Sequence, residues 1–99
     1  MSYRLRLTPH AADDLLRLFE FMAERDLQAA GHARTLIAKS FEFLQTFPFA
    51  CRKASADHPF LRELVIDFGH TGFVALYEIE TNDTVTILAV RHQREDDFY

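Results

Sequence analysis

The chain has 99 residues, 48% of them hydrophobic, and a formal net charge of −4 at pH 7. This length suits one domain over residues 1–99, and the hydrophobic fraction excludes a disordered chain. Residues 51–99 carry nine Asp and Glu against five Lys and Arg, which argues against a large nucleic-acid footprint, because phosphates are neutralised by cations.

The single cysteine, Cys51, excludes an internal disulfide. No stretch approaches the roughly 20 apolar residues of a membrane span, and the N-terminus lacks the apolar run of a signal peptide. We therefore expect a cytoplasmic protein without a membrane partner. The five histidines show no metal-ligand spacing, so neither a metal nor a cofactor is expected.

The first half of the chain predicts a strand followed by two helices. Tyr3 to Leu7 alternates with period two, as a half-buried strand does. Thr8 offers an N-cap hydroxyl and Pro9 suits the first helical position, which predicts a helix to about Arg25. Its apolar face comprises Ala11, Ala12, Leu15, Leu16, Phe19 and Met22, with polar residues opposite.

A second helix is expected to begin after Asp26, which can cap it, and to end at about Phe47. The short connection favours an antiparallel helix pair. Pro48 stops this helix, and residues 49–59 have no regular pattern. Three strands are then predicted over residues 60–68, 72–79 and 84–91, with turns at residues 69–72 and 81–83.

These elements predict an α+β fold of order β-α-α-β-β-β. A helical hairpin would pack on one face of a mostly antiparallel four-stranded sheet. We expect the last strand to enter the core through Val85, Ile87 and Ala89, and the uncovered face to hold Arg62 and Arg91. A small sheet with one bare face leaves a surface for partners.

Three segments resemble a known family. They are residues 7–15 (LTPHAADDL), residues 62–69 with 72–77 (RELVIDFG and GFVALY), and residues 87–95 (ILAVRHQRE). Together they resemble toxins of the RelE/ParE superfamily from bacterial type II toxin–antitoxin modules, and the ParE branch more than the RelE branch. The resemblance implies an antitoxin that wraps and silences the toxin.

The two branches imply different activities. Well-studied members of the ParE branch poison DNA gyrase by protein contact, whereas the RelE branch contains ribosome-dependent mRNA nucleases. The leading interpretation is a gyrase-directed toxin that does not itself bind nucleic acid and is not an enzyme. The alternatives are a ribosome-dependent mRNA endonuclease, and a degenerate toxin that binds its antitoxin but poisons nothing.

A nuclease would need cations on the scissile phosphate, a base and an acid. Arg62 and Arg91 could hold phosphate, His92 could transfer a proton, and Tyr99 could act through its phenol or by stacking on a base. Each residue also has a simpler role, as a solvated charge, an ion-pair partner or a structural side chain. The carboxylates of residues 95–97 would repel a phosphate backbone, so no catalytic residues are expected.

Partner surfaces have better support in the sequence. Phe21 lies on the polar side of the first helix, where it either folds onto the core edge or anchors an antitoxin segment. The terminal aromatics either pack back on the core or serve as a target-binding tail. The candidates for binding an antitoxin or target are Phe21, Arg62, Arg91, His92, Phe98 and Tyr99.

Overall fold

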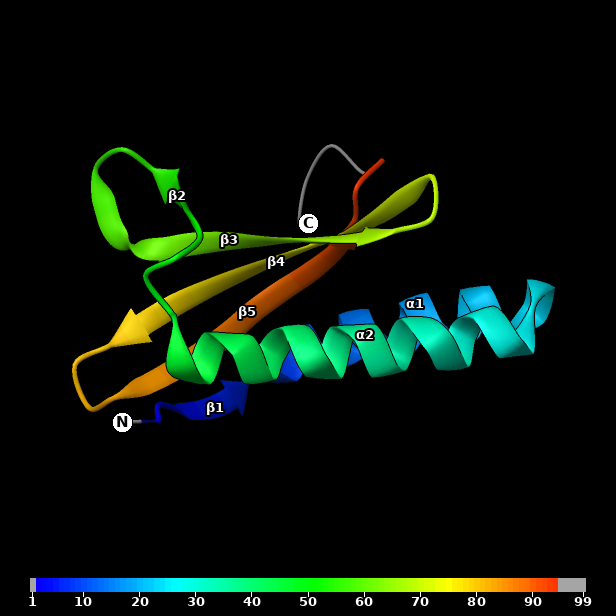
Figure 1. Cartoon of the computed structure of the whole chain (residues 1–99), viewed down its shortest axis with the longest axis horizontal. Coiled ribbons are helices and arrows are strands. Elements are labelled where there is room, and N and C mark those ends of the chain that lie inside the picture. Colours follow the sequence, from blue (N-terminus) through cyan, green and yellow to red (C-terminus); the bar gives the residue numbers. More distant parts are fainter. Residues whose placement is uncertain (1, 95–99) are drawn as a thin grey trace.

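Two helices lie along one face of a five-stranded sheet in the computed structural model, which describes residues 2–94 (Figure 1). The elements are β1 (Arg4–Leu7), α1 (Pro9–Arg25), α2 (Leu27–Thr46), β2 (Arg52–Ser55), β3 (His58–Phe68), β4 (Thr71–Glu80) and β5 (Thr84–His92). The predicted helical hairpin on a mostly antiparallel sheet is confirmed.

The strands are arranged in the order β1-β5-β4-β3-β2, with β1 parallel to β5 and all other pairs antiparallel. The prediction of four strands was wrong by one, because β2 lies within the stretch expected to be irregular. This edge strand has no buried residue and no apolar alternation, so only its partner defines it. An ion pair between Arg52 Nε and Glu63 Oε1, 3.0 Å apart, reinforces the ladder.

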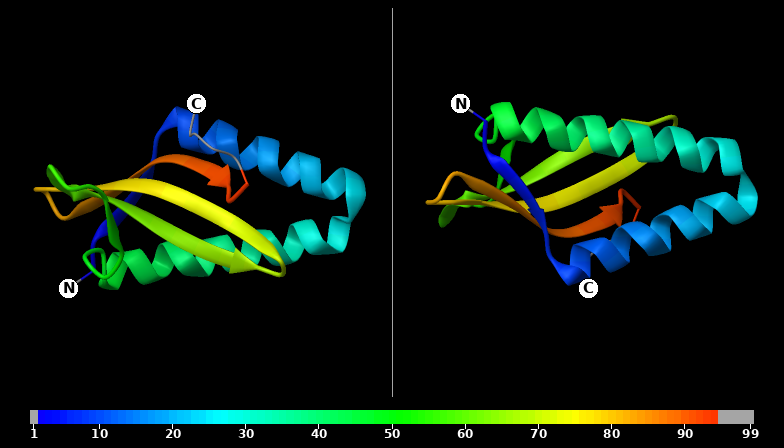
Figure 2. Two further views of the ribbon diagram at one scale, coloured as in Figure 1. Left: turned by 90° about the horizontal axis from the view of Figure 1, so that it is seen from above. Right: turned by 90° about the horizontal axis from the view of Figure 1, so that it is seen from below.

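Both predicted helix caps are confirmed. The Ala11 amide donates to Thr8 Oγ1 (3.1 Å), and the Ala29 amide donates to Asp26 Oδ1 (3.0 Å). Asp26 also ends α1, since its own amide donates to the carbonyl of Met22 (2.8 Å). One residue therefore separates the two helices, which fixes them as the antiparallel pair seen from both sides of the sheet in Figure 2.

The core lies between the helices and the covered face of the sheet, and its largest fully buried side chains are Tyr77, Phe73, Leu44, Ile87, Val85 and Val90. Val85 and Ile87 of the last strand are buried in this core, as expected, whereas Ala89 is buried opposite Leu76 and Val90 enters the core in its place. Leu16, which the sequence placed on the apolar face of the first helix, is instead more than half exposed, and so is Phe47 at the end of the second helix. Asp14, by contrast, is buried, so the inward stripe of α1 is rotated from the predicted one.

A one-residue bulge interrupts the pairing of β4 with β5. Leu76 pairs with Ala89 and Tyr77 with Ile87, which leaves Leu88 as the extra residue. Side chains alternate between faces along a strand, so one added residue exchanges the faces of everything beyond it. His92 pairs with the core residue Phe73 and so lies on the helix-covered face, whereas Arg91 lies on the open face.

Candidate functional site

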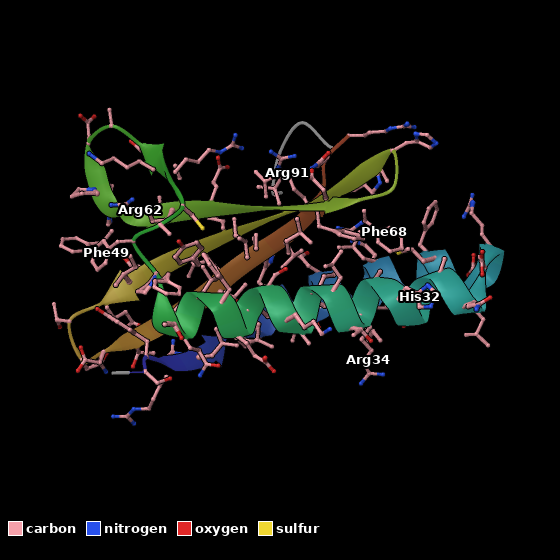
Figure 3. The ribbon with its side chains drawn as sticks, in the orientation of Figure 1. His32, Arg34, Phe49, Arg62, Phe68 and Arg91 are labelled. Atoms are coloured by element: carbon pink, nitrogen blue, oxygen red, sulfur yellow. The ribbon has the colours of Figure 1, made fainter. Side chains whose placement is uncertain are left out.

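Arg62 lies on the helix-covered face, opposite the buried Tyr77, so its predicted place on the open face was wrong. Its guanidinium donates to three carbonyls: Nε to Pro59 (2.7 Å), and Nη1 to Cys51 (2.8 Å) and Phe49 (3.3 Å). Figure 3 shows Arg62 beside Phe49, whose ring centroid lies 5.4 Å from the guanidinium carbon. These bonds hold the loop before β2 against the start of β3.

Tyr77 also holds this loop, because its buried hydroxyl donates to the carbonyl of Pro48 (2.6 Å). Burial, followed by the neighbouring Cys51 thiol, raises the pKa of the Tyr77 phenol above its ordinary value of 10.0. The neutral phenol is therefore favoured in the folded chain, which binds more protons than the unfolded chain above pH 10. Stability supplied by this phenol is complete below pH 10 and falls as the pH rises.

Tyr77→Phe is expected to lower the free energy of unfolding at pH 7 by about 1–3 kcal/mol, because the Pro48 carbonyl loses its buried donor. Between pH 10 and 11 the wild type should lose about 1 kcal/mol more than the variant, which has no phenol to ionise. Urea unfolding at pH 7, 10 and 11 measures both effects. If the free energy of unfolding changed equally with pH in the two proteins, burial would not raise the pKa of the Tyr77 phenol.

Arg91 lies on the open face, as predicted, opposite Val74. Its Nη1 donates to the carbonyls of His92 (3.3 Å) and Gln93 (3.4 Å), which draws the side chain over the end of its own strand. Arg91 is labelled in Figure 3 above the sheet, on the side away from α2.

The imidazole of His92 supports the turn that follows β5 and the β3–β4 hairpin. Its Nε2 lies 2.8 Å from Thr71 Oγ1, and its Nδ1 accepts from the Arg94 amide (3.2 Å). Since Nδ1 accepts, Nε2 carries the proton in the neutral ring and donates to the threonine. The ring also meets Phe73 edge to face, with centroids 6.1 Å apart.

The three nuclease candidates within residues 2–94 are not gathered at one place. Arg62 and His92 share a face, but their partners Tyr77 and Phe73 are four positions apart on β4, or about 13 Å. Arg91 lies on the other face. The remaining candidates, Phe98 and Tyr99, lie outside the described residues.

Phe21 is 55% exposed on α1, so its ring does not fold onto the edge of the core and is available to a partner. The guanidinium carbon of Arg25, one turn further along α1, lies 3.9 Å from the centroid of the Phe21 ring. This cation–π contact covers one side of the ring and leaves an apolar surface beside a positive charge.

Phe21 and His92 line one groove of about 550 Å³, together with Arg17, Leu18 and Arg94. We call this the α1–β5 groove, because α1 forms one wall and the end of β5 with its following turn forms the other. Leu18 and Phe21 supply apolar surface, and the two arginines supply positive charge. No carboxylate is among these lining side chains, so the groove suits a polypeptide segment that carries apolar and acidic residues.

The sequence identified two of the five lining residues and missed Arg17, Leu18 and Arg94. Arg17 and Leu18 had a usable signal, since they lie one turn before Phe21 on the same helix. Arg94 had none, because its place beside α1 follows from tertiary packing. Among the described residues no three His, Cys, Asp or Glu side chains group to hold a metal ion, and none of their helices is long and apolar enough to cross a membrane.

Comparison with known proteins agrees with the fold and its order of elements. Residues 5–97 match the family model described as the ParE toxin of the type II toxin–antitoxin system parDE. The chain belongs to the ParE toxin family. It is 33% identical over 91 residues to Toxin RelE3 of Caulobacter vibrioides, an alignment that covers 92% of this chain and 95% of that toxin.

Two solved structures share the fold of this ParE-family toxin. One is the chromosomal ParDE toxin–antitoxin system from P. aeruginosa, with a TM-score of 0.71, 21% identity, and coverage of 96% of this chain and 98% of that one. The other is the RelBE2 toxin–antitoxin complex from Mycobacterium tuberculosis, with a TM-score of 0.58, 26% identity, and coverage of 93% and 99%. The resemblance to the RelE/ParE superfamily, and to its ParE branch, is confirmed.

Proposed function

We propose that this ParE-family toxin, when free, poisons DNA gyrase by protein–protein contact, and that a cognate antitoxin neutralises it by filling the α1–β5 groove. Both partners would meet it in the cytoplasm. The observation that carries the proposal is the match to the ParE family over residues 5–97, joined to a half-exposed phenylalanine in a cationic groove.

The groove has the chemistry of a protein-binding site. Exposed aromatic anchors beside arginines are enriched among the residues that dominate binding energy at protein interfaces. Phe21 fits this description, because Arg25 lies over its ring while Arg17 and Arg94 flank the groove. An antitoxin segment with an apolar side chain next to carboxylates would bury the ring and pair with the arginines.

The positions of the nuclease candidates favour a protein target over mRNA cleavage. The Arg62 guanidinium is already bonded to three carbonyls, and Arg91 and His92 lie on opposite faces of the sheet. A cleavage site would need phosphate-binding and proton-transferring groups within hydrogen-bond reach of one substrate bond. The acidic second half of the chain adds to this, since it opposes a bound phosphate backbone.

A supercoiling assay with purified gyrase tests the proposed target. Stoichiometric toxin is expected to stop supercoiling and to trap DNA cleaved by gyrase, and prior mixing with the antitoxin should restore supercoiling. Gyrase that remains fully active in toxin excess would overturn the proposal. Breaks in translated mRNA during growth arrest would then identify a nuclease, and normal growth on induction would identify a toxin without a target.

A further inference from the structure

Beyond Leu7, where the pairing of β1 with β5 ends, two backbone polar groups of β5 near the bulge bond instead to α1 and its cap. The carbonyl of Leu88, the extra residue, accepts from Thr8 Oγ1 (3.0 Å). The Val90 amide donates to Asp14 Oδ2 (2.9 Å) inside the protein. The Thr8 hydroxyl therefore has two roles. It caps α1 by accepting from the Ala11 amide, and it donates to the carbonyl of the bulge residue.

Asp14 is only 8% exposed, and a carboxylate so buried requires partners. Besides the amide, its Oδ2 lies 3.4 Å from His10 Nε2 and its Oδ1 lies 3.9 Å from an Arg17 nitrogen. The neighbouring Asp13 is exposed and points away from the core. Two adjacent carboxylates on one helix thus have different surroundings, and only one joins α1 to β5.

The bulge decides which side chain of β5 faces α1. If the ladder were regular and Leu88 paired with Leu76, Arg91 would pair with Phe73 and face the core, and His92 would lie on the open face. The groove would then lose one of its lining residues, and the turn to Arg94 would leave β5 from the other face. Whatever holds the bulge therefore holds the second wall of the groove in place.

We propose that Asp14 is a positioning residue for the α1–β5 groove. Its carboxylate fixes the register of the end of β5 against the helix that carries Arg17 and Phe21, and so sets how the two walls face each other. The binding of an antitoxin segment in this groove rests on the proposed function. The effect of Asp14 on the shape of the groove is independent of that function.

Affinity for the cognate antitoxin, measured by calorimetry at a temperature where every variant is folded, tests the role in binding. Asp14→Ala is expected to weaken binding about tenfold or more, whereas the matched Asp13→Ala stays within about twofold of wild type. Asp14→Asn should recover most of the loss, because its amide oxygen can still accept from Val90. Unchanged affinity in Asp14→Ala would overturn the proposal.

A double-mutant cycle separates positioning from general destabilisation. Asp14→Ala and Phe21→Ala should be non-additive in antitoxin affinity, because both act through one groove. Asp14→Ala and Phe60→Ala should be additive, since Phe60 lies at the start of β3, outside the groove. Equal coupling in the two cycles would mean a merely structural role and would overturn the proposal.

Nuclear magnetic resonance on the free toxin tests the geometry without any partner. In Asp14→Ala the contact of the His92 ring with Phe73 should weaken and the Val90 amide should exchange faster, while the contacts of Tyr77 persist. An unchanged His92–Phe73 contact would overturn the proposal. If that contact is lost but Phe21→Ala leaves antitoxin binding intact, the positioning role of Asp14 stands and the antitoxin binds elsewhere than in the α1–β5 groove.

Discussion

Replacing Phe21 with alanine is expected to weaken antitoxin binding by about 30-fold or more, the effect of losing roughly 2 kcal/mol at an aromatic anchor. The ring is 55% exposed in the free toxin and would be covered in the complex. Because it contributes little to the core, the variant should keep the unfolding temperature of the wild type within a few degrees. Calorimetric titration and thermal unfolding measure the two quantities.

Phe60→Ala is the matched control, since Phe60 is also a half-exposed phenylalanine but does not line the α1–β5 groove. Its antitoxin affinity should fall by no more than about threefold, as for most interface-peripheral truncations. An affinity lost equally in both variants would show that exposed aromatic surface in general, and not the groove, holds the antitoxin.

Gly72→Ala is expected to lower the free energy of unfolding by about 3 kcal/mol or more. A Cβ at this position would lie 2.1 Å from the carbonyl oxygen of Ile66 and 2.8 Å from Nε2 of Gln93. The Gln93 side chain can move, but the Ile66 oxygen belongs to the neighbouring strand, so β3 and β4 would have to part where their hairpin begins. Chemical denaturation measures the loss.

Gly31→Ala is the control for the glycine substitution. Nothing lies within 4 Å of a Cβ built at Gly31, in the second turn of α2. Alanine should therefore stabilise the toxin by about 0.5–1 kcal/mol, because helical glycine costs backbone entropy. A tolerated Gly72→Ala would contradict the close approach at the β3–β4 hairpin.

Features set by neighbouring residues could be predicted from the sequence. Thr8 with Pro9, and Asp26, start their helices through bonds to amides three residues away, so the pattern itself contains the contact. The alternation of Leu64 and Ile66 with exposed Val65 likewise shows which side of β3 is buried. Strand β2 gave no such signal, because Arg52 to Ser55 is an edge strand that β3 defines.

The site depended on contacts between distant segments. No local pattern indicates that Leu88 is an extra residue in the ladder, and without that bulge the face of His92 cannot be derived. Arg62 looked like an open-face charge because its carbonyl acceptors, such as Cys51, lie in a loop without regular structure. Phe21 and Arg94 are 73 residues apart in the sequence, so their shared groove required the fold.

Hydrogen–deuterium exchange on the toxin, free and bound to its cognate antitoxin, tests the central claim that the α1–β5 groove is the seat of the antitoxin. Binding is expected to slow exchange most strongly in two separate segments, the second half of α1 around Phe21 and the end of β5 with the turn to Arg94. Protection limited to β2 and the open face of the sheet, with both groove walls unchanged, would contradict it.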